Sequence, residues 1–252
     1  MNTRFILKNF TQIFKRFCSR SYPNQSAVTV TESEIQKRLI DPVGRKQTFQ
    51  NLHEKGLTSK QVSKLKNANS NYVGSAVLMP FCFVQNELSI LFIIRSSFQP
   101  SHAGQVGFPG GRLDAEDRSV EDAVLRETFE EIGIPSHEIE IWNKVVSEKK
   151  ISNSPIGIVF GFVKDFNHEK LNICEREVHD VFTVPIKDLL DPSKHGYTKF
   201  RWGNQMPVFV NQHRNVWGLT AMFTNIFLRS LFPETHRLST FRSLQNMEET
   251  HR

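Results

Sequence analysis

The chain contains 252 residues, of which 38% are hydrophobic, and this composition suits one domain of moderate size with extensions. No run of about 18 uncharged apolar residues occurs, which argues against a membrane-spanning helix. Three widely spaced cysteines without a CxxC pair argue against a disulfide framework and against a zinc site.

The formal net charge of +6 is concentrated at the N-terminus, where residues 1–31 carry five basic side chains and no acidic one. Without these five charges the net charge falls to +1, and no basic stripe remains that would predict nucleic-acid binding. Apolar residues recur between the basic ones at helical spacing: Ile6, Phe10, Ile13, Phe14 and Phe17. We therefore predict a mitochondrial transit peptide at 1–25 and a location in the matrix, with a basic tail or surface helix on a cytoplasmic protein as the alternative.

Short polar segments follow and predict a helical extension over residues 26–70. Thr31 or Thr29 is placed to cap a helix over residues 32–40, and a second short helix is predicted at 58–67. The main domain is expected over residues 71–232. The polar residues 233–252 are expected to form a loose C-terminal tail.

The main domain begins with β-branched and aromatic runs that predict strands at 73–84 and 88–94. The residues between them, Gln85-Asn86-Glu87, indicate a hairpin. A loop rich in Gly, Pro, Ser and Asp follows at 95–118. These features place the loop directly after the second strand of a sheet.

A helix is predicted after this loop, with Ser119 as its N-cap and Gly133 as the residue that ends it. Two more strands are predicted at 156–163 and 181–185. A helical turn at 186–191 and a long apolar helix capped by Asn215 complete the pattern, which predicts a mixed layered fold of the α/β (α+β) class.

The helix after the loop carries two kinds of side chain at helical spacing. Leu125, Phe129 and Ile132 share one side and are expected to bury against the sheet. The opposite side would carry three carboxylates: Glu127, Glu130 and Glu131. Carboxylates one turn apart repel each other, whereas Mg²⁺ would reverse the sign of that interaction. A solvated acidic face is the ordinary alternative.

The segment Arg126-Glu127-Thr128-Phe129-Glu130-Glu131-Ile132-Gly133-Ile134 resembles the second half of the Nudix box, the signature of the Nudix hydrolases. The pattern is G-x5-E-x7-R-E-U-x-E-E-x-G-U, where U is a bulky aliphatic residue. Gly111 opens the box here, and Asp117 takes the place of the first Glu. There are two further departures from the pattern. Eight residues instead of seven separate Asp117 from Arg126, and Thr128 stands at a U position. The resemblance implies an α/β/α sandwich with a mixed β-sheet.

The resemblance also implies roles for individual residues. Mg²⁺ or Mn²⁺ would be held by Glu127, Glu130 and Glu131, with the carbonyl of Gly110 as a further ligand. Arg126 would pair with a carboxylate of the box and position it. Water would attack a diphosphate, with Glu130 or Glu177 as the base, so that the implied catalytic residues are Arg126, Glu130, Glu131 and Glu177.

The loop before the box is similar to the motif of Nudix enzymes that cleave coenzyme A, LLTxR-[SA]-x3-R-x3-G-x3-FPGG. Two departures are "LFI" for "LLT" and Pro100 where a second arginine is expected, for which His102 is a partial substitute. The similarity extends over residues 73–232. The implied substrate-binding residues are Arg95, Ser96, His102, Gly104, Phe108 and Gly111.

The implied reaction is cleavage of coenzyme A (CoA) or acyl-CoA to 3′,5′-ADP and 4′-(acyl)phosphopantetheine. Two alternatives stay open, namely a Nudix hydrolase for NADH or ADP-ribose and a catalytically silent Nudix-fold binding module. A small molecule is thus the expected partner, without nucleic acid or a membrane span, and a homodimer is left open.

Overall fold

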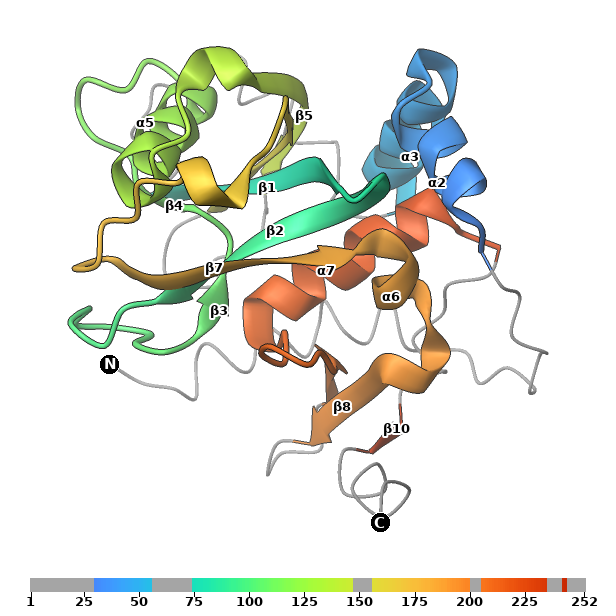
Figure 1. Ribbon diagram of the computed structural model, residues 1–252. Coiled ribbons are helices and arrows are strands. Elements are labelled where there is room, and N and C mark those ends of the chain that lie inside the picture. The colour runs from blue at the N-terminus through green and yellow to red at the C-terminus, as the bar shows by residue number, and fades with distance from the viewer. Residues whose placement is uncertain (1–29, 56–73, 147–155, 200–204, 235–241, 244–252) are drawn as a thin grey trace. The chain divides into compact units, whose positions relative to one another are not determined.

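The computed structural model describes residues 30–55, 74–146, 156–199, 205–234 and 242–243 (Figure 1). The chain divides into two compact units. One unit comprises residues 57–186, and the other comprises residues 1–56 and 187–252. The expected transit peptide at 1–25 and the expected helix at 58–67 lie outside the described residues. The expected domain boundaries stay predictions.

The unit of residues 57–186 is built on a seven-stranded mixed sheet. The path β3-β2-β1-β6-β5 forms its centre, β4 pairs with β1, and β7 pairs with β2. The β1–β6 pair is parallel and the other pairs are antiparallel. The strands are β1 (Ser75–Val84), β2 (Glu87–Arg95), β3 (Val106–Gly107), β4 (Gly110–Arg112), β5 (Ile139–Val146), β6 (Ile156–Val163) and β7 (Val178–Pro185). The predicted mixed sheet is confirmed, but β3, β4 and β5 were not predicted.

The expected hairpin joins β1 to β2 through a two-residue turn. Gln85 and Asn86 both have positive φ, 50° and 65°, while Val84 pairs with Glu87. Positive φ at both central residues is the geometry whose twist matches that of the flanking strands. Glu87 therefore belongs to β2 and not to the turn.

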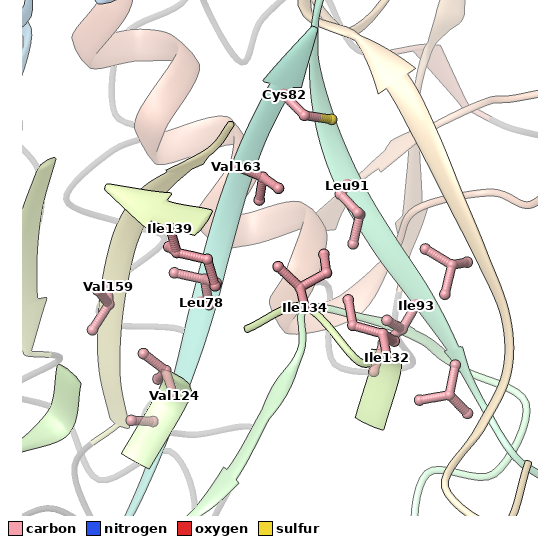
Figure 2. Packing of buried hydrophobic residues seen from close by; sticks show 13 residues of the cluster. Leu78, Cys82, Leu91, Ile93, Val124, Ile132, Ile134, Ile139, Val159 and Val163 are labelled. Carbon is pink, nitrogen blue, oxygen red and sulfur yellow. The ribbon is translucent and has the colours of Figure 1, made fainter. Parts of the chain in front are cut away.

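Helix α5 (Val120–Ile132) begins and ends where the sequence predicts. The Ser119 hydroxyl accepts a hydrogen bond from the backbone N–H of Asp122 at 3.1 Å. Gly133 adopts φ 77°, a left-handed conformation that is costly for residues with a side chain. Figure 2 shows Val124 and Ile132 of α5 in the core cluster with side chains from the sheet, including Leu78 and Leu91.

The predicted orientation of α5 is wrong for two residues. Phe129 is 57% exposed, whereas Glu131 is buried at 2%. Thr128 is also fully buried, and its hydroxyl donates to the carbonyl of Val124 at 2.6 Å. The buried face of α5 therefore comprises Ala123, Val124, Thr128, Glu131 and Ile132, and it leaves Phe129 exposed.

In the unit of residues 1–56 and 187–252, the described residues form three longer helices and a three-stranded sheet in the order β10-β8-β9. Its helices are α2 (Glu32–Leu39), α3 (Pro42–Lys55) and α7 (Gly218–Leu231), and its strands are β8 (His195–Lys199), β9 (Gln205–Phe209) and β10 (Arg242–Ser243). The short helix α6 (Ile186–Leu190), predicted as a helical turn, follows β7. No described helix combines the length and the apolar character needed to cross a bilayer.

The predicted N-caps of two of these helices can be compared with the structure. Thr31 and Glu34 form a reciprocal capping box at the start of α2, which settles the choice between Thr31 and Thr29. The assignment of Asn215 as the cap of the last helix is wrong, because α7 starts after Trp217, which makes no side-chain cap bond. Helix α3 was not predicted, since its largely polar sequence shows no clear apolar stripe.

Candidate functional site

Three carboxylates gather at one end of the sheet of residues 57–186. Glu127 and Glu131 lie one turn apart on α5, and Glu177 directly precedes β7. One oxygen from each carboxylate lies within 4.8 Å of the others. Opposite ligands of an octahedral ion with bonds of 2.1 Å are about 4.2 Å apart, so this spacing is close to what Mg²⁺ requires. We call these three residues the carboxylate cluster.

Glu177 reaches the carboxylate cluster because the segment before it caps the end of α5. The backbone N–H of Asn172 donates to the carbonyl of Ile132 at 3.2 Å, and that of Cys174 donates to the carbonyl of Glu131 at 2.9 Å. The N–H of Glu177 then donates to the carbonyl of Cys174 at 2.8 Å, which turns the chain into β7. The last carbonyls of α5 therefore accept hydrogen bonds from the segment of Asn172 and Cys174, and the same segment positions Glu177.

The two glycines of the loop before α5 contact the cluster closely. The N–H of Gly110 donates to Oε2 of Glu131 at 2.9 Å. At Gly111 a β-carbon would lie 2.3 Å from Oε1 of Glu127, so a side chain fits there only if the Glu127 carboxylate moves away. The structure thus places the N–H of Gly110 on the cluster, while metal ligation by its carbonyl stays a prediction.

Arg126 links the loop of the box to the carboxylates of α5. Its guanidinium donates twice to Asp117, from Nε at 3.2 Å and from Nη2 at 2.9 Å. Its Nη1 donates to Glu127 at 3.2 Å and to Glu130 at 3.0 Å. Asp117 is buried, and the Arg126 hydrogen bonds hold the pKa of its carboxyl below the usual range. Asp117, which replaces the first Glu of the box pattern and lies one residue further from Arg126 than that pattern has it, is therefore hydrogen-bonded to Arg126.

Glu130 differs from the other two glutamates of the helix. Its side chain is half exposed and is paired with Arg126 on the outer face of α5. The described group with metal-ligand spacing comprises Glu127, Glu131 and Glu177, without Glu130. The roles predicted for Glu130, as ligand or base, stay predictions.

Burial and mutual repulsion make the cluster unfavourable without a cation. Burial raises the pKa of Glu131 to about 8, with a further increase from Glu127, although the Gly110 N–H and Arg95 oppose this. Burial also raises the pKa of Glu127. A divalent cation would favour the ionised form of both carboxylates, and three hard oxygen donors suit Mg²⁺ or Mn²⁺. The residues present therefore fit the implied metal.

The loop between β2 and β3 holds most of the predicted substrate-binding residues. Arg95 ends β2, and Ser96 is buried, with its N–H donating to the carbonyl of Glu177 at 2.9 Å. The N–H of Gly104 donates to the carbonyl of Arg95 at 2.9 Å and closes the loop. His102 is exposed, with φ 60° and a hydrogen bond from its ring to the Gln105 side chain. The loop therefore starts beside Glu177.

Phe108 lies in a different place from the predicted substrate-binding residues of the loop between β2 and β3. It is 5% exposed, and its ring stacks on Phe92 of β2 with centroids 5.3 Å apart. This packing holds the segment before Gly110 against the sheet. Substrate contact by Phe108, as by Arg95, Ser96, His102, Gly104 and Gly111, stays a prediction.

Comparison with known proteins places this arrangement in context. The NUDIX domain profile matches residues 75–202. The mitochondrial coenzyme A diphosphatase of Homo sapiens is 34% identical over 168 residues, which cover 65% of this chain and 71% of that protein. The Mus musculus protein of the same name is 34% identical over 169 residues, covering 65% and 80%. Nudix hydrolase 3 of Caenorhabditis elegans is 32% identical over 199 residues, covering 71% and 81%.

Proposed function

The chain is a member of the Nudix hydrolase family, and on this premise we propose that it cleaves the diphosphate of coenzyme A and acyl-CoA in the presence of Mg²⁺ or Mn²⁺. The products would be 3′,5′-ADP and 4′-(acyl)phosphopantetheine. The observation that carries the proposal is the carboxylate cluster of Glu127, Glu131 and Glu177 beside the backbone N–H of Gly110. The names of the human and mouse relatives support the choice of substrate.

Individual residues have separate roles in the proposed reaction. The N–H of Gly110 fixes Glu131, and Arg126 fixes Glu127, so that two of the three carboxylates have defined positions. A bound divalent cation would neutralise phosphate oxygens and lower the pKa of a water molecule. In the reaction a water molecule attacks phosphorus, the bond to the leaving phosphate oxygen breaks, and a carboxylate of the site accepts the proton that the water loses. Glu177 and Glu130 are the candidates for this base.

Substrate recognition is proposed for the loop between β2 and β3. Arg95 supplies a cation next to the cluster for a phosphate group, and Ser96 and Gly104 shape the backbone around it. Pro100 stands where the coenzyme A motif has an arginine, which removes one cationic contact. This departure favours a second candidate, hydrolysis of NADH or ADP-ribose. The intact carboxylate cluster argues against a silent binding module.

A substrate panel tests the proposal. The protein without residues 1–25 is incubated with Mg²⁺ and CoA, acyl-CoA, NADH or ADP-ribose, and the products are separated by chromatography. We expect release of 3′,5′-ADP from CoA or acyl-CoA at a kcat/KM at least about tenfold above that for NADH and ADP-ribose, a difference of roughly 1.4 kcal/mol in transition-state stabilisation. Faster cleavage of NADH or ADP-ribose would establish the second candidate. Binding of CoA without turnover would refute both.

Mitochondrial import is proposed from the basic, acid-free segment of residues 1–25 and from the names of the human and mouse relatives. We expect the full chain fused to a fluorescent protein to enter mitochondria and the fusion without residues 1–25 to stay in the cytosol. As a matched test of sufficiency, residues 1–25 alone should import the fluorescent protein. Import that survives the deletion would contradict this assignment.

A further inference from the structure

The loop between β2 and β3 carries an exposed aromatic side chain close to the carboxylate cluster. Phe98 is 80% exposed, more than any other large hydrophobic side chain among the described residues. It follows Ser96 by two residues, and the N–H of Ser96 donates to the carbonyl of Glu177 at 2.9 Å. Because consecutive Cα atoms are 3.8 Å apart, the Cα atoms of Phe98 and Ser96 are at most about 7.6 Å apart. The ring is therefore carried by the part of the loop that is attached to the segment of Glu177.

Hydrogen bonds hold the backbone on both sides of Phe98. The N–H of Gln99 donates to the carbonyl of Ser96 at 3.2 Å and closes a turn around Phe98. The N–H of Phe98 donates to the Ser96 hydroxyl at 3.5 Å, and Nε2 of Gln99 donates to the carbonyl of Arg176 at 3.5 Å. The turn is thus attached to the segment of Glu177 both before and after Phe98.

The loop around this turn is uncharged and partly apolar. Residues 96–105 contain no lysine, arginine or carboxylate, and His102 is the only residue among them that can carry a positive charge. Pro100 is exposed like Phe98, so two apolar side chains face solvent within three residues. A single exposed hydrophobic residue is ordinary, but this pair borders a site whose other features suit phosphate and metal. Such a surface favours contact with an uncharged, apolar part of the substrate.

The diphosphate of coenzyme A joins two halves of different chemistry. The adenosine half carries a further phosphate on its ribose, whereas the pantetheine arm is uncharged and exposes two methyl groups and several methylene groups. A loop without fixed positive charge does little for the ribose phosphate, while Phe98 and Pro100 can remove apolar atoms of the arm from water. ADP-ribose and NADH have a polar ribose in place of the arm.

We propose that Phe98 is a specificity-determining residue that contacts the pantetheine arm and so distinguishes coenzyme A from ADP-ribose and NADH. Phe98 stands at a position where the coenzyme A motif accepts any residue, so the motif does not predict this contact. The apolar contact offsets part of the cationic contact that is lost at Pro100. The inference rests on the proposed function, because the arm belongs to the proposed substrate.

Binding of the two product halves tests this inference without turnover. 4′-Phosphopantetheine and 3′,5′-ADP are titrated separately, with Mg²⁺ present, into the unmodified full chain and into Phe98→Ala, Phe98→Leu and Phe129→Ala, and the heat of binding is measured. Phe129→Ala is the matched control, because it removes the same ring from an exposed position about 200° around α5 from Glu127 and Glu131.

We expect Phe98→Ala to bind 4′-phosphopantetheine about three- to tenfold more weakly, while its affinity for 3′,5′-ADP stays within about twofold. Phe98→Leu restores apolar surface, so it should stay within about twofold of the unmodified chain for both halves, as should Phe129→Ala. Because Phe98 is exposed, all four proteins should unfold at the same urea concentration.

Three results would overturn the inference. Equal weakening of both halves would place Phe98 against the adenosine, and unchanged binding of both would leave it an ordinary surface residue. Absence of 4′-phosphopantetheine binding to the unmodified chain would exclude the contact altogether. Failure of the proposed function is a separate result, namely no cleavage of any substrate in the panel, and the titrations decide the role of Phe98 in either case.

Discussion

Replacement of Glu131 by glutamine is expected to stabilise the metal-free protein and to lower its hydrolytic rate by about 10²- to 10⁴-fold. The rate falls because a cluster carboxylate is lost, and metal-assisted charge stabilisation provides several kcal/mol to such reactions. Stability rises because Glu131 is buried and its pKa is raised to about 8. The amide oxygen of glutamine can still accept from Gly110, and its amide group can donate to Glu127 or Glu177.

The stabilisation has a defined pH dependence. The unfolded chain ionises Glu131 near the ordinary pKa of 4.5, whereas the folded chain ionises it only near 8. Between these values the unfolded state releases its proton first, so the unmodified protein loses stability as pH rises and then levels off above 8. The difference in favour of Glu131→Gln should therefore grow from pH 5 to pH 8, to on the order of 2–4 kcal/mol.

Urea unfolding in the presence of a chelator, at several pH values, measures this difference. Glu130→Gln is the matched stability control, because it makes the same change at the neighbouring, half-exposed position. It should show no comparable growth with pH. Addition of Mn²⁺ should stabilise the unmodified chain and not Glu131→Gln. A Glu131→Gln protein that is less stable than the unmodified chain at pH 8 without metal would contradict the burial argument.

The elements with strong local signals could be predicted from the sequence. The hairpin at Gln85-Asn86 and the ends of α5 at Ser119 and Gly133 depend on a few adjacent residues whose backbone preferences are strong. Helix α3 could not be found this way, because its buried residues Phe49 and Leu52 lie in an otherwise polar segment. Its formation depends on packing within its own unit, for example a hydrogen bond from Asn51 to the carbonyl of Ser230.

In the candidate site, too, some features follow from the local sequence and others depend on tertiary packing. The spacing of Glu127 and Glu131 was readable, but the burial of Glu131 was not, because hydrophobicity alone favoured Phe129 for the core. Glu177 lies 46 residues after Glu131 in the chain, and only the family resemblance pointed to it. Its approach depends on hydrogen bonds between the end of α5 and the segment of Asn172 and Cys174. The partner of Asp117 likewise appears only once the loop is folded onto Arg126.

Gly110→Ala is expected to destabilise the protein by about 3–5 kcal/mol and to abolish measurable turnover. Gly110 has φ 143°, and a β-carbon there would lie 2.3 Å from the carbonyl oxygen of Ala76 and 2.6 Å from the Cα of Val77. These atoms belong to the backbone of β1, so they can move only if the β1–β4 pairing opens. Overpacking and an unfavourable φ each cost about 1–3 kcal/mol. The same displacement would withdraw the N–H that holds Glu131.

Two neighbouring glycines provide graded controls for this prediction. Gly104 also has positive φ, 69°, but a β-carbon there meets no atom within 4 Å, so Gly104→Ala should cost only about 1–2 kcal/mol. A β-carbon at Gly111 would meet the carboxylate of Glu127, which can turn away at the loss of one hydrogen bond from Arg126. Gly111→Ala should therefore leave the free energy of urea unfolding nearly unchanged while it weakens Mn²⁺ binding, because Glu127 must leave the cluster. If Gly110→Ala and Gly104→Ala unfold at the same urea concentration, the close contact between β4 and β1 does not determine the position of the glycine loop.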